Sequence, residues 1–260
     1  VGDIDGNCSL ILDAYKRGVA AGAEIVVVPE LAITGYPPRD LLLKAHFIHR
    51  NFEALALLAK ATGETALLVG YVGRSHKDHG RSLTNSVAVL QNGEIVGHRD
   101  KTLLPTYDVF DEDRYFEPAH QNLPIEINGR LIGVTICEDL WNEEEFCRER
   151  RYASKPPEAL VEAGAELILN LSASPWNLEK DRVRTRMLSG IAKRSRVPVV
   201  YCNLVGGNDE LVFDGNSLAF DRSGALIAKG AAFAEDFLVV DTEAAEVMED
   251  APVPDEELLH

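Results

Sequence analysis

The sequence predicts an α/β protein whose core is formed by β-sheets packed face to face, with helices on the outside. Three observations lead to this prediction. Helical and strand patterns alternate near both ends of the chain, strands joined by short turns lie between them, and 260 residues are enough for one large core in a single domain.

The first half of the chain begins with a helix and a buried strand. Asn7 is a suitable N-cap for a helix that Gly22 ends, and the β-branched run at 25–28 is typical of a strand covered on both faces. A second helix is expected over 46–61. Strands are expected at 65–72, 85–91, 94–99, 124–127 and 130–137. The Asn-Gly pairs at 92–93 and 128–129 predict a hairpin between the two strands that flank each pair.

The second half repeats the alternation of helices and strands. Helices are expected at 156–163 and 178–196, and the second of them is basic. Strands are expected at 166–172, 197–203, 217–220, 225–229 and 237–240, the last of which completes the sheet. After Asp241 the composition becomes acidic and proline-bearing, and we interpret that segment as a linker or arm.

Composition argues against several classes of partner. The net charge of −16 repels phosphates and anionic lipids, so nucleic acid and membrane surfaces are poor candidates, and no apolar run is long enough to cross a bilayer. The four cysteines, at 8, 137, 147 and 202, form no CxxC pair, which argues against a structural zinc site or a disulfide framework. We therefore expect no metal site and a reducing, cytoplasmic location.

Three strand ends carry residues that could perform chemistry. Glu30 follows one buried strand, Lys101 follows a hairpin strand, and Cys137 ends another strand and precedes two acids. Taken singly, Glu30 and Lys101 could be solvated charges and Cys137 a small core residue. Together they supply the base, the cation and the thiol that amide cleavage by a cysteine nucleophile requires. None of the seven histidines lies at a convincing strand end, which argues against a Cys–His pair.

The segments around these residues resemble a known family. VVPELAITGYPP, KTLLPTYDVFDE and ICEDLW resemble the motifs of the Glu–Lys–Cys triad in the nitrilase, or carbon–nitrogen hydrolase, superfamily. PELAITGYPPRDLLL, NLSASPWNLEK and NLVGGNDELVFDGNSLAF are similar to the glutaminase domain of glutamine-dependent NAD synthetases, and the similarity extends from residue 1 to about residue 245. This resemblance implies a four-layer αββα sandwich of nitrilase type, usually paired about a two-fold axis, and hence a homo-oligomer.

The resemblance also implies a catalytic sequence. Cys137 would attack the side-chain amide of L-glutamine to form a thioester. Glu30 would serve as general base and acid. Lys101 would stabilise the oxyanion together with a main-chain N–H just after the cysteine, and it would offset the charge of the acids there.

Further roles follow from the same resemblance. Glu112 would orient the lysine and the substrate, although it could equally be one acid of a solvated DVFDED loop. Tyr107, Ser174 and Lys180 would bind glutamine. Their simpler interpretations are a turn residue before proline for Ser174 and an exposed residue in the first helical turn for Lys180. The cysteines at 8, 147 and 202 are expected to be structural or surface thiols.

The chain also departs from the family pattern. The family's first strand, which precedes the VGD segment, and the synthetase domain with its serine-glycine-glycine loop are absent, and residues 142–157 look longer than the usual connection. We expect a glutaminase domain at 1–245 and a linker at 246–260 toward a synthetase domain in a longer chain or a separate subunit. Glutamine hydrolysis would need no cofactor, whereas ATP and Mg²⁺ would belong to the synthetase domain.

Two alternatives stay open at this point. The first is a stand-alone amidase of the same superfamily, similar to ω-amidase, that acts on another small amide. The second is a non-catalytic assembly module that uses the faces of the sandwich for oligomer contacts, although the complete set of Glu30, Lys101 and Cys137 argues against it.

Overall fold

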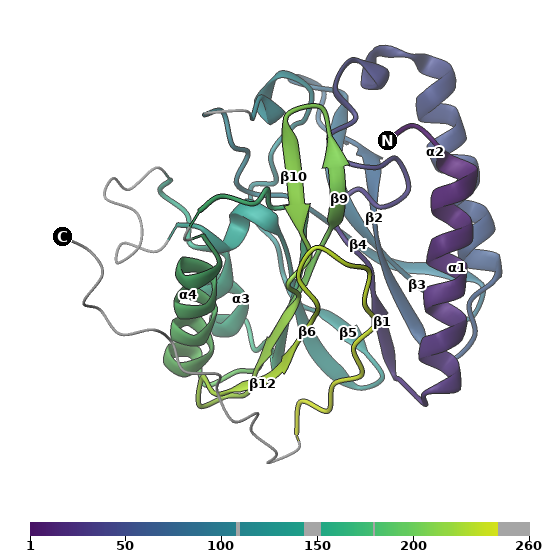
Figure 1. Ribbon diagram of the computed structural model, residues 1–260. Helices are drawn as coiled ribbons and strands as arrows, with labels where there is room; N and C mark the ends of the chain where they lie inside the picture. Colours follow the sequence, from purple (N-terminus) through teal and green to yellow (C-terminus); the bar gives the residue numbers. More distant parts are fainter. Residues whose placement is uncertain (108–109, 143–151, 179, 244–260) are drawn as a thin grey trace.

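The computed structural model describes residues 1–107, 110–142, 152–178 and 180–243 (Figure 1). The expected arm at 246–260, Cys147 and most of the segment 142–157 lie outside the described residues. In chain order the elements are α1 (Ile4–Ala20), β1 (Ile25–Val27), the 3₁₀ helix η1 (Arg39–Leu43), α2 (Ala45–Lys60), β2 (Ala66–Arg74), β3 (Leu83–Gln91), β4 (Glu94–Asp100), η2 (Glu112–Arg114), β5 (Ile125–Ile127), β6 (Arg130–Ile136), η3 (Cys137–Leu140), α3 (Pro156–Glu162), β7 (Leu167–Ser172), α4 (Lys180–Ser195), β8 (Val199–Asn203), β9 (Val205–Asn208), β10 (Leu211–Asp214), β11 (Leu218–Phe220) and β12 (Leu226–Lys229).

The described strands form two large sheets and one small hairpin. The first sheet has the order β1-β2-β3-β4, with β1 parallel to β2 and the later pairs antiparallel. The second has the order β12-β11-β8-β7-β6-β5, parallel at its centre and antiparallel at both edges. Because parallel neighbours require crossover connections, α3 lies between β6 and β7 in the chain and α4 lies between β7 and β8.

The apolar residues of a single strand alternate between two cores. In β2, Leu67 and Val69 belong to the cluster shared with α1 and α2, whereas Ala66 and Leu68 belong to the cluster that also contains Val134 of β6. The second cluster therefore lies between the two sheets. Figure 1 shows α1 and α2 outside the first sheet and α3 and α4 outside the second. The predicted four-layer αββα sandwich is confirmed.

Both predicted hairpins are present. Asn92 and Gly93 have φ values of 53° and 84° and join β3 to β4. Asn128 and Gly129 have φ values of 52° and 78° and join β5 to β6. Two consecutive residues with positive φ match the twist of the flanking strands, and Asn followed by Gly adopts this conformation at little cost.

Helix α1 begins earlier than predicted. Its N-cap is Asp3, whose carboxylate accepts the N–H of Gly6 at 3.0 Å. Asn7 lies inside the helix and donates its side-chain amide to the carbonyl of Ile33 at 3.0 Å. The prediction of Asn7 as the cap was therefore wrong, and an aspartate earlier in the chain fills this role equally well.

The expected strand at 237–240 was wrong. These residues form no strand, and they share the lining of a groove of about 1380 Å³ with β1. The ring of Phe237 lies beneath the guanidinium of Arg17, 4.2 Å from the ring centroid. An extended apolar run forms a strand only where another strand edge lies within about 4.8 Å. No strand among the described residues pairs with this run.

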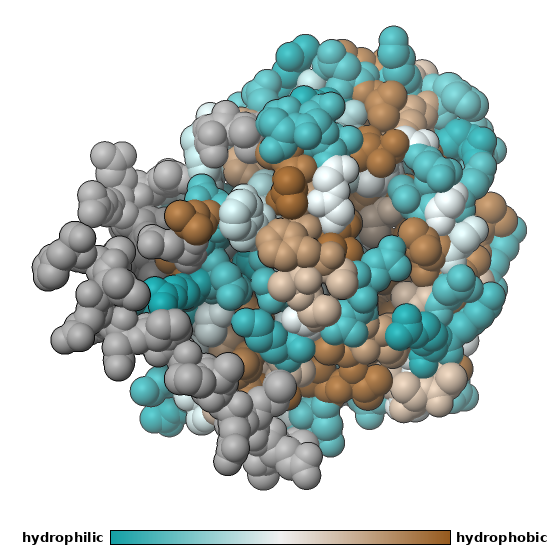
Figure 2. Space-filling model, in the orientation of Figure 1, coloured by the Kyte–Doolittle hydropathy of each residue, from teal (hydrophilic) through white to brown (hydrophobic). Residues whose placement is uncertain are grey.

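Apolar side chains gather near the middle of the face shown in Figure 2, over the segment that follows β12. Phe233 belongs to this segment, and its ring packs edge to face with that of Trp176 at a centroid distance of 5.9 Å, although both residues are about half exposed. Exposed aromatic residues are enriched at protein interfaces. The homo-oligomer stays a prediction. None of the helices in the described part of the chain is both long and apolar enough to cross a membrane.

Candidate active site

Cys137 lies where β6 ends and η3 begins. Its φ is +43°, in the left-handed region that residues other than glycine seldom adopt. Backbone strain of this kind is concentrated at functional sites, and a strained turn after a strand presents the nucleophile in other hydrolases. Cys137 is only 4% exposed, so the thiol lies in an enclosed site.

Glu30 and Lys101 form a buried ion pair. Lys101 Nζ donates to Glu30 Oε1 at 2.8 Å, and the two side chains have no solvent exposure. The main-chain N–H of Lys101 donates to the carbonyl of Asn85 at 2.8 Å, so the pairing with β3 continues one residue beyond β4. The alternative that Lys101 is a solvated charge is therefore wrong. Burial acts to lower the pKa of Lys101, but the carboxylates of Glu112 and Glu30 raise it well above its usual value and keep the amine charged.

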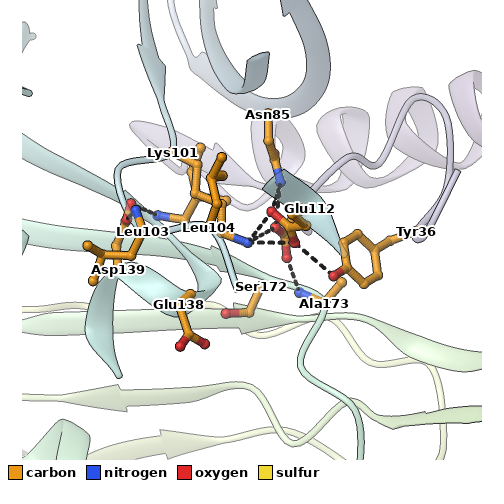
Figure 3. A network of polar contacts seen from close by, with 12 residues as sticks. Tyr36, Asn85, Lys101, Leu103, Leu104, Glu112, Glu138, Asp139, Ser172 and Ala173 are labelled. Carbon is orange, nitrogen blue, oxygen red and sulfur yellow. Dashed lines mark hydrogen bonds and ion pairs between the residues drawn. The ribbon is translucent and has the colours of Figure 1, made fainter. Parts of the chain in front are cut away.

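Glu112, on η2, joins this cluster. Lys101 Nζ donates to its two carboxylate oxygens at 2.8 and 2.9 Å, and the hydroxyl of Tyr36 donates to Oε1 at 2.8 Å. Burial raises the pKa of Glu112, although Lys101 opposes this effect. Glu112 is 5% exposed, so it is not a solvated loop acid. Figure 3 shows Tyr36 and Lys101 directed toward Glu112.

Glu30 is held through both of its carboxylate oxygens. Oε1 accepts the side-chain amide of Asn85 at 2.7 Å, in addition to Lys101. Oε2 accepts the main-chain N–H of Ala173, just beyond β7, at 2.9 Å. A carboxylate fixed in this way has a defined orientation toward any group that it deprotonates.

The thiol of Cys137 is protonated at rest. Burial raises its pKa, the nearby carboxylate of Glu30 raises it further, and Lys101 only partly offsets these effects. Cysteine nucleophiles react as the thiolate, so a thiol with a raised pKa would need a base to remove its proton before it could act in this way. Glu30 is the carboxylate that acts most strongly on it.

The three expected glutamine contacts are all connected to this site. Lys180, the first residue of α4, donates to the carbonyl of Pro175 at 2.9 Å, and burial lowers its pKa while Cys137 and Glu138 act in the opposite direction. The exposed position considered for Lys180 is therefore wrong. Ser174 is 1% exposed and directly follows Ala173. The hydroxyl of Tyr107 donates to Glu138 at 2.8 Å.

The two acids after the cysteine are both engaged by other groups. Glu138 is buried and accepts the hydroxyls of Tyr107 and Tyr152, the second at 3.2 Å. Figure 3 shows its carboxylate apart from the cluster around Lys101 and Glu112. Asp139 accepts the main-chain N–H groups of Thr102, Leu103 and Ile136. Both acids that follow Cys137 are therefore held by hydrogen bonds to other parts of the chain.

Several residues at the site were missed from the sequence. Tyr36 and Asn85 received no role, although Tyr36 lies within the quoted GYPP segment. The β9–β10 hairpin was also missed, and it supports the segment after β7 through a bridge between Pro175 and Phe213. The sequence signal for this hairpin was the aspartate at 209, because aspartate tolerates a positive φ better than most residues. In the structure Asp209 lies in the turn with a φ of 52°.

Two of the other cysteines lie elsewhere in the fold. Cys8 packs beside the first core, and Cys202 contacts the carbonyl of Val27 at 3.6 Å. Burial raises the pKa of Cys202 to about 12, so its thiol is unreactive near neutral pH. In the described ranges, no cluster of three or more histidine, cysteine or acidic side chains is arranged to hold a metal ion.

An αββα sandwich whose buried cysteine is acted on by the charges of a buried glutamate–lysine pair is typical of amidohydrolases. The chain belongs to the carbon-nitrogen hydrolase family, which matches residues 1–251. The resemblance inferred from the motifs is thus confirmed, and the protein is an enzyme of amidohydrolase type.

More specific relatives are glutamine-dependent NAD(+) synthetases. The chain is 42% identical over 244 residues to the one from Synechocystis sp., a match that covers 92% of this chain and 44% of the relative. It is 39% identical over 249 residues to the one from Thermotoga maritima, a match that covers 95% of this chain and 41% of the relative. The chain therefore spans less than half the length of these relatives.

Solved structures show the same fold. Glutamine-dependent NAD+ synthetase from Acinetobacter baumannii superposes with a TM-score of 0.81 at 33% identity, covering 91% of this chain and 42% of that one. An amidase of the nitrilase superfamily from Nesterenkonia AN1 superposes with a TM-score of 0.72 at 22% identity, covering 88% of this chain and 82% of that one. At that identity, the second likeness concerns the fold alone.

Proposed function

We propose that this chain hydrolyses the side-chain amide of L-glutamine through a thioester on Cys137 and releases ammonia. The observation that carries the proposal is the buried Glu30–Lys101–Glu112 cluster whose charges act on the thiol of Cys137. The glutamine-dependent relatives support the choice of substrate.

The first half of the reaction forms the thioester. Glu30 takes the thiol proton while Cys137 Sγ attacks the amide carbon, and the carbonyl oxygen becomes an oxyanion. Lys101 and the main-chain N–H of Glu138 stabilise that charge. When the intermediate collapses, Glu30 returns the proton to the departing nitrogen, so the C–N bond breaks and neutral ammonia leaves.

The second half of the reaction regenerates the thiol. Glu30 removes a proton from a water molecule, which attacks the thioester carbon. The C–S bond then breaks, and the thiolate of Cys137 recovers the proton from Glu30. The new γ-carboxyl group loses its own proton to solvent, and the product leaves as glutamate. Glu112 holds Lys101 in place throughout, because both of its oxygens accept from the lysine amine.

Charged groups beside the thiol favour an α-amino acid amide over a simple amide. Lys180 and Glu138 have opposite charges, and both act electrostatically within the site. A zwitterionic substrate offers a carboxylate for Lys180 and Ser174 and an ammonium group for the acidic side. Tyr107, which donates to Glu138, adds a further polar group to this part of the site.

We further propose that the ammonia serves ATP-dependent amidation of nicotinate adenine dinucleotide to NAD by a synthetase domain. That domain would belong to a longer form of the polypeptide or to a separate subunit, and ATP and Mg²⁺ would bind there. The names of the relatives and the share of their length that the chain spans support this role.

Labelling with a diazo-ketone analogue of glutamine, followed by mass spectrometry, tests the proposal. We expect one equivalent of label on Cys137 and protection by L-glutamine. Steady-state ammonia release should give a kcat/KM for L-glutamine at least about 100-fold above that for butyramide, which lacks both charged groups. Preference for butyramide would instead indicate an amidase for another small amide, and no labelling of the folded protein would favour an assembly module.

A further inference from the structure

Asp139, two residues after Cys137, binds main-chain groups from two different parts of the chain. Its side chain is buried, with 1% of the residue exposed. Oδ1 accepts the N–H groups of Thr102 and Leu103 at 3.0 and 2.8 Å. Oδ2 accepts the N–H of Ile136 at 2.9 Å. Figure 3 shows Asp139 directed at the backbone of Leu103.

The donors are the immediate neighbours of two proposed catalytic residues. Thr102 and Leu103 follow Lys101, and Ile136 precedes Cys137. Lys101 follows β4 at the edge of the first sheet, whereas Cys137 follows β6 in the second sheet. The two strands share no ladder, so main-chain pairing does not set the distance between their ends.

We propose that Asp139 is a positioning residue that sets the placement of the Lys101 amine relative to the Cys137 thiol. One rigid carboxylate joins the two strand ends across the sandwich. This inference rests on the proposed function, in which the amine must stabilise an oxyanion formed at the thiol. A misplacement of about 1 Å between reacting groups can reduce the rate about 100-fold.

Only a carboxylate satisfies this set of donors. It accepts through both oxygens and carries no hydrogen of its own when ionised. An asparagine at 139 retains one acceptor oxygen, which could still accept from Thr102 and Leu103. Its NH₂ group would then face the N–H of Ile136, and two donors repel each other. Asp139→Asn therefore breaks the connection to the cysteine turn while it changes the volume of the side chain very little.

The experiment compares Asp139→Asn with a matched control, Asp5→Asn. Asp5 is an exposed aspartate that pairs with Arg50 on the surface. Active sites are counted by labelling of Cys137 at saturation, so misfolded protein does not contribute to the measured kcat. We expect kcat per labelled site to fall at least about 100-fold in Asp139→Asn with KM within threefold of wild type, and no change in Asp5→Asn.

Two outcomes separate this inference from the proposed function. Wild-type protein without glutaminase activity would reject the proposed function itself. Active wild-type protein together with Asp139→Asn at more than one third of the wild-type kcat would overturn only the positioning role. A purely structural role would lower the number of labelled sites but leave the kcat of each site unchanged.

A measurement on wild-type protein covers the case in which Asp139→Asn does not fold. Burial raises the pKa of Asp139 to about 7, while the three main-chain N–H groups and Lys101 hold it down. Protonation weakens all three hydrogen bonds together. In ¹H–¹⁵N spectra recorded from pH 5 to 9, the amide signals of Thr102, Leu103 and Ile136 should therefore shift with one common midpoint. Unrelated midpoints, or no shift, would contradict the shared connection.

Discussion

Replacing Lys101 by methionine removes the positive charge from the buried cluster but keeps most of the side-chain volume. The substitution deletes hydrogen bonds of 2.8 Å to Glu30 and of 2.8 and 2.9 Å to Glu112. The two carboxylates then lie buried without a cation. In the proposed mechanism the oxyanion also loses one of its two donors.

The expected loss of activity follows from that missing donor. Removing one oxyanion donor typically costs 100- to 1000-fold in kcat, or ~2.7–4 kcal/mol of transition-state stabilisation. We therefore expect kcat to fall at least about 100-fold.

Stability should change with pH in a defined direction. Breaking a buried ion pair by removing one partner costs ~3–5 kcal/mol when the remaining charge persists. Burial raises the pKa of Glu112, and the variant removes the Lys101 charge that opposes this effect, so the folded-state pKa of Glu112 lies further above its unfolded value. The contribution of such a carboxyl group to stability is fully present below its unfolded pKa and is lost as the pH rises through its folded pKa. The variant should therefore approach wild-type stability in acid and fall increasingly below it toward neutral pH.

Ammonia release from L-glutamine, coupled to glutamate dehydrogenase, measures the activity, and urea unfolding at several pH values measures the stability. Lys77→Met is a matched control, because Lys77 pairs with Glu117 at 2.7 Å near the surface and outside the site. It should keep the wild-type kcat. A Lys101→Met variant within threefold of the wild-type kcat would refute the role of Lys101 in oxyanion stabilisation.

Three further substitutions test other parts of the structure. Cys137→Ala should abolish ammonia release yet keep the melting temperature within about 4 °C of wild type, because it removes little volume; turnover at the wild-type rate would reject the thioester mechanism. Lys180→Met should raise the KM for glutamine at least about 10-fold with little effect on kcat, since binding to the α-carboxylate is the same in substrate and transition state; an unchanged KM would exclude this contact. Arg184→Met leaves Asp214, its fully buried partner at 3.0 Å, without a cation, and urea unfolding should show a loss of ~3–5 kcal/mol. A loss below ~1 kcal/mol would mean that the amides of Asn203 and Asn216 suffice.

Features governed by local rules were predicted well. The Asn-Gly turns at 92–93 and 128–129 require two residues with positive φ, and only a few residue types adopt this conformation easily. The buried strand before Glu30 was recognisable because parallel strands covered on both faces are continuously apolar. Glu30, Lys101 and Cys137 could be singled out as candidates because each lies at the end of a strand, and strand ends are where rigid backbone positions functional groups.

Features that depend on distant partners were not predictable in the same way. The run at 237–240 is as apolar as a strand, yet a strand also needs an unpaired edge at the right distance. Asn85 looked like an ordinary strand residue until the fold placed its amide against Glu30 at 2.7 Å. Asn7 was expected to cap the first helix, but Asp3 caps it and Asn7 instead donates to the carbonyl of Ile33.

The amino-acid sequence by itself determined the layers of this protein, the two Asn-Gly hairpins and which side chains are candidates for the site. These properties follow from periodicity, turn preferences and functional groups, which are encoded over a few neighbouring residues. Only the tertiary structure decided that Lys101 is charged in a fully buried site, that the pKa of the Cys137 thiol is raised, and that Asp139 connects two strand ends. Each of these depends on burial and on partners remote in the chain, because both the pKa of a group and the geometry of a carboxylate are set by what surrounds it in space.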